Sequence, residues 1–334
     1  MHLFRCALLF IIALFATAAH AAEPVVLRFA TLVPDGTAWA RELKAAAREV
    51  ESQTQGQVRW KWYFGGIAGD ERVVPERIRR GQLEGEAAGV SCVDLAPSLR
   101  VLRVLGMFRR RDEAHAIIMR LRPTLEAEFH KAGFELLAVQ WFGSDIAVTR
   151  EPVRSLADLR KLRLWYWDID PVWSKQLAQL GLKTVPLGVN EAGAAFDQGR
   201  IDGFLALPTA ALAFQWSSRA HYYSDLSFAS MAACSIISRQ AFDALPLEAQ
   251  QIIRTAATKA SIRFEDINGA QEDQLLGGLF EKQGMHRVAA SVPFREEFLD
   301  QARAARDALP DSVVPRALIT RVLGWLSDFR AERP

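Results

Sequence analysis

The sequence has little of the residue types that mark several common functional classes. Among its 334 residues are three cysteines and six histidines. No histidine pair has the His-x-x-x-His spacing, and no cysteines have metal or redox spacing, so we expect no metal site. An excess of one charge is also missing, because 41 basic residues face 39 acidic ones. This balance excludes the basic stripe of a nucleic-acid-binding protein, and we expect no nucleic-acid partner.

Long hydrophobic runs are missing after the N-terminus. Arg5 precedes an apolar stretch, residues 7–18, that is too short to span a bilayer comfortably. Ala19-His20-Ala21 then fits a small-x-small cleavage pattern. We therefore predict a cleavable signal peptide over residues 1–22, cut after Ala21 or Ala22, and an exported mature protein.

Catalytic motifs are missing as well. Ser144 lies in Phe-Gly-Ser-Asp, without the Gly-x-Ser-x-Gly elbow of a hydrolase. Nothing in the sequence brings Cys92 and His115 together as nucleophile and base. The spacing of Cys92 and Cys234 matches no metal or redox motif. We expect buried free thiols, and a single disulfide between them stays open. We expect that the protein is not an enzyme and that it has no catalytic residue and no cofactor.

The patterns that the sequence does contain are those of an α/β protein. Alternating residues 27–31 and 58–64 predict strands, and helical spacing over 39–50 places a helix between them. A second α/β series follows residue 155, and residues 86–92 read as a short buried strand. Pro246 begins a helical pattern that reaches Gln283, about 55 Å long if uninterrupted. We expect a helix of that length to lie across two lobes.

Several motifs together resemble the substrate-binding proteins of TRAP transporters, the DctP-like periplasmic solute receptors. The segments that carry the resemblance are Trp62–Glu71, Asp158–Trp165, Leu180–Leu187 and Gly199–Gly203. The resemblance implies a two-lobed periplasmic binding protein fold with a long helix bridging both lobes. We expect lobe I to comprise 24–140 plus 230–268, and lobe II 141–229 plus 269–330. It also implies TRAP membrane permease subunits as partners.

The departures from the family pattern concern the ligand. The family's carboxylate-binding Arg aligns with Trp165, and a second Arg of some members aligns with Asp145. Such a site resembles a divergent branch of the family that is associated with a periplasmic tetratricopeptide-repeat partner. The cost of removing a ligand carboxylate from water would be poorly compensated in such a site. An apolar or aromatic ligand fits, as does a cationic group held by Asp145 and tryptophan faces.

We expect the ligand-binding residues at the carboxyl ends of strands, between the lobes. They are Trp165, Trp167, Trp141, Phe142, Asp145, Val33, Trp39, Gly66, Val90, Leu207 and Trp216. Two alternatives remain open: Trp167 could be a core residue, and Asp145 could serve a structural hydrogen bond. We expect Trp60 and Trp62 to be core residues. The sequence thus predicts a receptor that captures a small, apolar or aromatic ligand and delivers it to a permease. The alternative is a ligand-binding or sensor protein that works with a periplasmic partner without transport.

Overall fold

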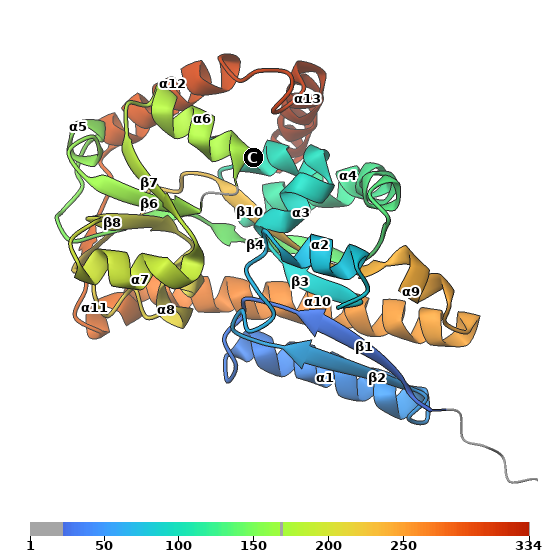
Figure 1. Ribbon diagram of the computed structural model, residues 1–334. Coiled ribbons are helices and arrows are strands. Elements are labelled where there is room, and N and C mark those ends of the chain that lie inside the picture. The colour runs from blue at the N-terminus through green and yellow to red at the C-terminus, as the bar shows by residue number, and fades with distance from the viewer. Residues whose placement is uncertain (1–22, 168–169, 334) are drawn as a thin grey trace, which may run out of the picture.

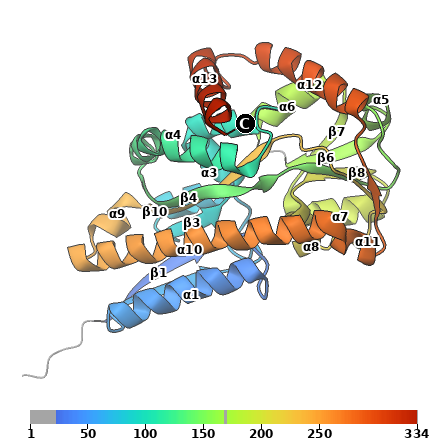
Figure 2. The same ribbon diagram turned by 180° about the vertical axis from the view of Figure 1, so that it is seen from behind.

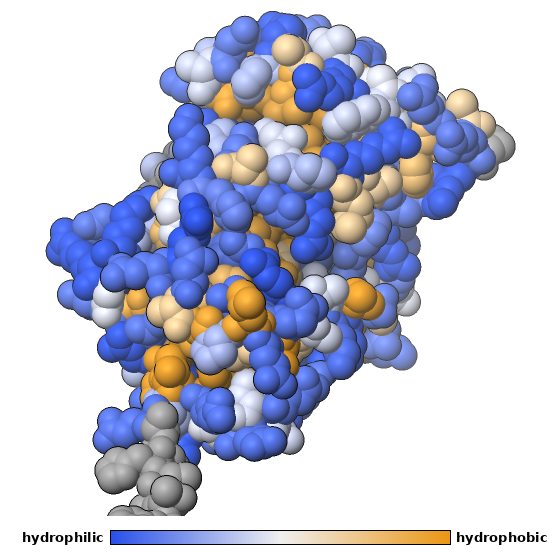
Figure 3. All heavy atoms as spheres, turned by 90° about the vertical axis from the view of Figure 1, so that its right-hand side faces the viewer, coloured by the Kyte–Doolittle hydropathy of each residue, from blue (hydrophilic) through white to orange (hydrophobic). Residues whose placement is uncertain are grey.

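The computed structural model describes residues 23–167 and 170–333. The predicted signal peptide, residues 1–22, lies outside the described residues. Within the described ranges, none of the helices combines the length and the hydropathy that a bilayer crossing requires. Figure 3 shows one face of the molecule, which is largely hydrophilic, with apolar side chains gathered mainly in its lower half.

Five strands form the first sheet, in the order β2-β1-β3-β10-β4 (Figure 1). They are β1 (Val25–Ala30), β2 (Val58–Tyr63), β3 (Gly85–Ala88), β4 (Phe134–Ser144) and β10 (Ser230–Ser238). β1 pairs in parallel with β2 and β3, whereas β10 runs antiparallel to β3 and β4. The parallel pair follows from the β-α-β pattern, because helix α1 (Ala38–Gln53) carries the chain back between the two strands.

Six strands form the second sheet, in the order β11-β9-β5-β8-β6-β7. They are β5 (Ile146–Thr149), β6 (Arg163–Trp167), β7 (Lys183–Leu187), β8 (Gly203–Ala206), β9 (Tyr222–Ser224) and β11 (His286–Val288). Each sheet with the helices packed on it is called a lobe here, lobe I for the five-stranded sheet and lobe II for the six-stranded one.

The chain passes between the lobes along two extended segments. β4 lies in the first sheet and β5 in the second, and Asp145 alone separates them. The chain returns between β9 and β10, where Phe228 N–H donates to the Asp145 carbonyl and Asp145 N–H donates to the Ala229 carbonyl. These two crossings place Asp145 at the junction of the lobes.

The remaining helices cover the outer faces of both sheets. In chain order they are α2 (Val74–Arg79), α3 (Val90–Leu95), the 3-10 helix η1 (Pro97–Arg103), α4 (Arg111–Lys131), α5 (Leu156–Leu159), α6 (Pro171–Gln179), α7 (Val189–Asp197), α8 (Pro208–Ala213), α9 (Arg239–Asp243), α12 (Val292–Asp307) and α13 (Arg316–Glu332). Several begin with a side-chain cap, as at α1, where Thr37 Oγ1 accepts from Ala40 N–H at 3.1 Å.

The long helix extends beside both lobes, as the sequence predicted. It consists of α10 (Leu247–Gln274), a π-helical segment (Leu275–Leu279) and α11 (Phe280–Lys282), and Figure 2 shows it passing from one lobe to the other. The predicted uninterrupted helix is thus broken once. Gly278 lies in the π segment with φ 120°, a backbone conformation open mainly to glycine.

Two expectations about local structure were wrong. The predicted strand 86–92 ends at Ala88, and residues from Val90 onward form α3. The last helix, which we expected in lobe II, packs on α4 and η1 in lobe I, and its Val322 and Leu326 are fully buried in that core (Figure 1). An apolar stripe shows that a helix packs, but not which lobe receives it.

Candidate ligand-binding site

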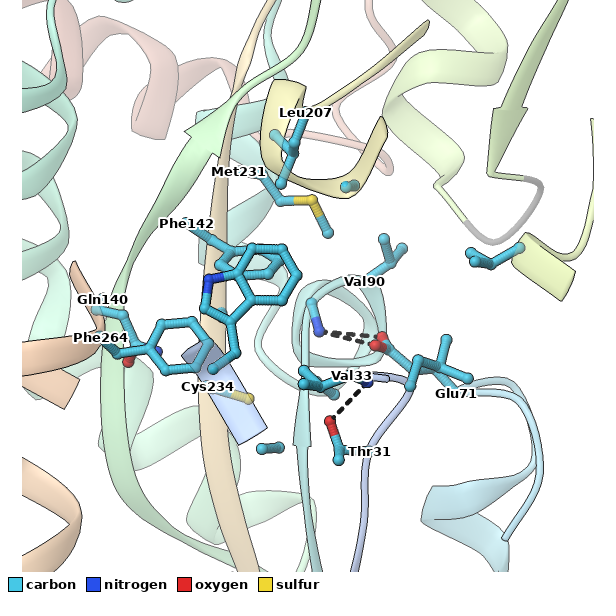
Figure 4. A pocket seen from close by; sticks show the side chains of 18 of the residues that line it. Thr31, Val33, Glu71, Val90, Gln140, Phe142, Leu207, Met231, Cys234 and Phe264 are labelled. Carbon is cyan, nitrogen blue, oxygen red and sulfur yellow. Dashed lines mark hydrogen bonds between the residues drawn. The ribbon is translucent and has the colours of Figure 1, made fainter. Parts of the chain in front are cut away.

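One cavity lies at the junction of the two lobes and has about 1210 Å³ of empty space, part of it open to solvent. Lobe I contributes Val33 and Trp39, lobe II contributes Trp165 and Leu207, and the crossing strand contributes Phe142. Figure 4 shows Leu207, Met231 and Val90 on one side of this space and Phe142 and Phe264 on another. The wall is therefore built mostly from apolar and aromatic side chains.

Most of the predicted site residues line this cavity. They are Trp165, Trp167, Phe142, Asp145, Val33, Trp39, Val90, Leu207 and Trp216. Whether each of them contacts a ligand stays a prediction. Trp141 and Gly66 do not lie on the cavity wall.

Strand geometry explains the position of Trp141. Successive side chains of a strand point to opposite faces of its sheet, so Trp141 and Phe142 cannot both face the cavity. Phe142 lines it, whereas Trp141 is 1% exposed within the core that α4 covers. Gly66 has φ 76° and lies behind Leu32, whose side chain would come within 2.9 Å of an added Cβ. Gly66 therefore allows close packing against Leu32, which itself lines the cavity.

The lobe II wall rests on an aromatic cluster. The Trp165 indole N–H donates to the Leu187 carbonyl at 3.0 Å, and its ring packs edge-on against Trp216 with centroids 4.8 Å apart. Trp216 in turn stacks on Phe204 at 4.7 Å. Trp165 is thus a rigid, uncharged wall whose only donor is already used.

The lobe I wall is also aromatic. The Trp39 ring lies 5.0 Å from Phe142 and 5.9 Å from Phe264, centroid to centroid. Trp60 and Trp62 stack on each other at 5.4 Å. We expected these two as core residues, and they do pack on Phe29 in the core, yet both also line the cavity. Sequence alternation predicted their shared face and could not show that this face was incompletely filled.

A buried cluster of charges at the junction was missed by the sequence. Arg103, at the end of η1, bonds Asp145 Oδ2 at 2.5 Å, Asp170 Oδ2 at 2.6 Å and the Ser230 carbonyl at 3.2 Å. Its guanidinium also lies over the Trp173 ring at 4.3 Å. The expectation that Asp145 could hold a cationic ligand was wrong, because Arg103 already occupies that carboxylate. No motif marked Arg103, since its partners lie far away along the chain.

A second acidic group, Glu71, reaches the cavity from the loop before α2. Its carboxylate accepts the N–H groups of Gly89 and Ser91 at 3.0 Å each. The dashed lines at Glu71 in Figure 4 mark the bonds from Gly89. Burial raises the pKa of Glu71 to about 7, against these hydrogen bonds, which lower it. Glu86 lies nearby, and burial together with the Glu71 charge raises its pKa well above 4.5. Burial therefore favours the protonated, uncharged form of both carboxyl groups.

The two mature cysteines form a disulfide, so the expectation of buried free thiols was wrong. The Cys92–Cys234 bond joins α3 to β10, and Cys234 lines the cavity. Within the described residues, no group of three or more His, Cys, Asp or Glu side chains is placed to hold a metal ion.

Comparison with known proteins agrees with this architecture. A curated solute-binding protein of Chromohalobacter salexigens is 24% identical over 234 residues, which is 68% of this chain and 67% of the relative. Another, from Verminephrobacter eiseniae, is 24% identical over 238 residues, 68% of each chain.

Solved structures share the fold at lower identity. A TRAP periplasmic solute-binding protein of Haemophilus influenzae with bound L-gulonate superposes with a TM-score of 0.83 at 16% identity, covering 91% of this chain and 99% of that one. One from Chromohalobacter salexigens with bound D-glucuronate gives 0.81 at 18%, covering 90% and 99%. The family model for bacterial extracellular solute-binding proteins, family 7, matches residues 29–309. The chain therefore belongs to this family of extracellular solute-binding proteins, the DctP family.

Proposed function

We propose that the protein is a periplasmic receptor of a TRAP-type transporter whose ligand is mainly apolar or aromatic and has no free carboxylate. It captures this ligand between its lobes and delivers it to a membrane permease. The predicted signal peptide and the family membership support the export and the transport role. A periplasmic tetratricopeptide-repeat protein remains a second expected partner.

The charge at the cavity carries the proposal on the ligand. Arg103 is the one basic side chain among the described residues that line the cavity, and both Asp145 and Asp170 already pair with it. With one positive and two negative charges, this cluster has a formal charge of −1. A ligand carboxylate would lose its hydration here without gaining a free cation, which is costly.

The ligands of the related structures are of a different kind from the one proposed for this protein. Those from Haemophilus influenzae and Chromohalobacter salexigens hold L-gulonate and D-glucuronate, and a Bordetella pertussis receptor binds pyroglutamic acid. Each of these ligands is a carboxylic acid. In this chain Trp165 stands where the resemblance puts the family's carboxylate-binding Arg, and indole cannot make the bidentate pair of a guanidinium. We propose this substitution as the origin of the changed specificity.

Calorimetry on the purified protein tests the proposal. D-glucuronate and succinate are expected to give no measurable binding, whereas the ligand recovered by native mass spectrometry of the purified protein is expected to be apolar or aromatic. Trp165→Ala should weaken that ligand by about 1–3 kcal/mol, the scale of burying a large side chain.

Two further variants separate binding from folding. Trp325→Ala, in α13 and away from the cavity, should leave affinity unchanged, while Leu207→Ala, which also changes the lobe II wall, should weaken it. Micromolar binding of succinate or D-glucuronate by the wild type would refute the proposed specificity.

A further inference from the structure

The cavity does not stop at the junction of the lobes. It continues into lobe I, where α1, α10 and one face of the first sheet enclose it. The side chains that line this extension include Leu43, Ala46, Trp62, Ala138, Ala257 and Ala260. Figures 1 and 2 both show α1 and α10 side by side. We call this part of the cavity the lobe I channel.

Small side chains create the channel. Ala257 and Ala260 lie three residues apart on α10, so they share one helix face, and Ala138 comes from the strand β4 beside them. Larger residues at these positions would fill the space, as they do elsewhere in this core. Protein interiors normally leave few voids larger than a water molecule. An unfilled apolar space destabilises the fold, so its presence indicates an occupant.

Among the described residues that line the channel none is charged, although the indole N–H of Trp62 is buried without a hydrogen-bond partner. The Gln140 and Ser261 side chains of the channel bond each other at 2.9 Å, which satisfies the Gln140 carbonyl oxygen. The ionisable groups lie instead at the junction, where Arg103 pairs with two carboxylates and Glu71 is held by backbone N–H groups. The cavity therefore has a polar end between the lobes and an apolar end within lobe I.

We infer that the ligand is a single-chain amphiphile whose slender apolar chain lies in the lobe I channel and whose uncharged polar end stays at the junction. This inference rests on the proposed function and goes further, because an aromatic molecule bound between the lobes would not need the channel. The negative charge of the Arg103 cluster disfavours an anionic end, so the polar end bonds through hydroxyl or amide groups.

A series of straight-chain alcohols tests the inference by calorimetry. Hexanol, octanol, decanol and dodecanol are expected to bind with affinity that rises roughly tenfold for each added pair of methylene groups. Decanoate should bind more weakly than decanol. Affinity that is independent of chain length, or decanoate binding as tight as that of decanol, would overturn the inference.

Variants of α10 place the chain. Ala260→Leu and, separately, Ala257→Leu should weaken dodecanol at least tenfold by filling the channel, and the rise with chain length should flatten. Ala270→Leu is the matched control, because Ala270 lies on the same helix and is exposed, so its substitution should change nothing. Thermal melting of each variant checks that the protein folds. If one channel variant does not fold, the other still tests the inference.

The outcomes separate the inference from the proposed function. If Trp165→Ala weakens alcohol binding while both channel variants leave it unchanged, the ligand lies between the lobes, so the inference fails and the proposed function stands. If alcohols do not bind and D-glucuronate does, both are refuted.

Discussion

Arg103 joins the lobes through charges that are almost fully buried, so its removal should be unusually destabilising. The side chains of Arg103, Asp145 and Asp170 are 6%, 5% and 2% exposed. Arg103→Met keeps much of the side-chain volume and the contact with Trp173, and removes only the guanidinium. We expect the free energy of unfolding to fall by about 3–5 kcal/mol, the range found when one partner of a buried ion pair is removed.

The loss comes mainly from Asp145. Asp170 retains the N–H groups of Val172 and Trp173, which donate to its Oδ1 at 3.0 and 3.1 Å. Asp145 would keep its burial and lose the charge that offsets it. Burial already raises the pKa of Asp145 above 3.8, against Arg103, which lowers it. Without Arg103 this pKa rises further.

The pH dependence follows from that shift. A carboxyl group whose pKa is higher in the folded state holds a proton that unfolding releases, so the free energy of unfolding increases as pH falls through that window. The deficit of Arg103→Met should therefore shrink between pH 7 and pH 4. Adding Asp145→Asn should restore part of the stability at pH 7, because it removes the unpaired charge.

Urea denaturation of wild type and variants at both pH values measures these effects. Arg100→Met is the matched control, since Arg100 lies in the same 3-10 helix and pairs at 3.4 Å with Asp94, whose side chain is 54% exposed. We expect that control to lose at most about 1 kcal/mol from its ion pair. A loss below about 1 kcal/mol for Arg103→Met would refute the view that this cluster is a buried, tightly coupled junction.

Two further predictions concern stability. Burial raises the pKa of Glu272 to about 8 and its Oε2 has no hydrogen-bond partner, so the free energy of unfolding should fall as pH rises from 4.5 to 8; Glu272→Gln should remove about 3–5 kcal/mol of that fall. Equal pH profiles of wild type and variant in urea denaturation would contradict this. Replacing Cys92 and Cys234 together by Ala opens a loop of sequence separation 142 and should lower the free energy of unfolding by about 2–5 kcal/mol, as should dithiothreitol in the wild type only. Two reactive thiols in the unreduced, denatured wild type would disprove the bond.

The cavity shows how local patterns and tertiary packing share the specification of this site. Alternation along β6 puts Trp165 and Trp167 on one face of the strand, and both line the cavity. The same alternation applied to β4 should have excluded Trp141 once Phe142 was placed. The loop of Gly66 alone suggested a place at the ligand, whereas the structure shows that this glycine, with its positive φ, packs against Leu32.

The sequence by itself determined the β-α-β units and the long helix, because hydrophobic periodicity and helix-stop residues act over a few neighbouring positions. The tertiary structure alone decided the pairing of Arg103 with Asp145 and Asp170, the Cys92–Cys234 bond and the lobe in which α13 packs. These partners lie tens to hundreds of residues apart, and no local pattern records which buried groups meet. The lobe I channel was likewise decided by the tertiary structure. An alanine on a helix face looks the same in the sequence whether neighbouring side chains fill the space beside it or leave that space for a ligand, and only the surrounding packing decides between the two.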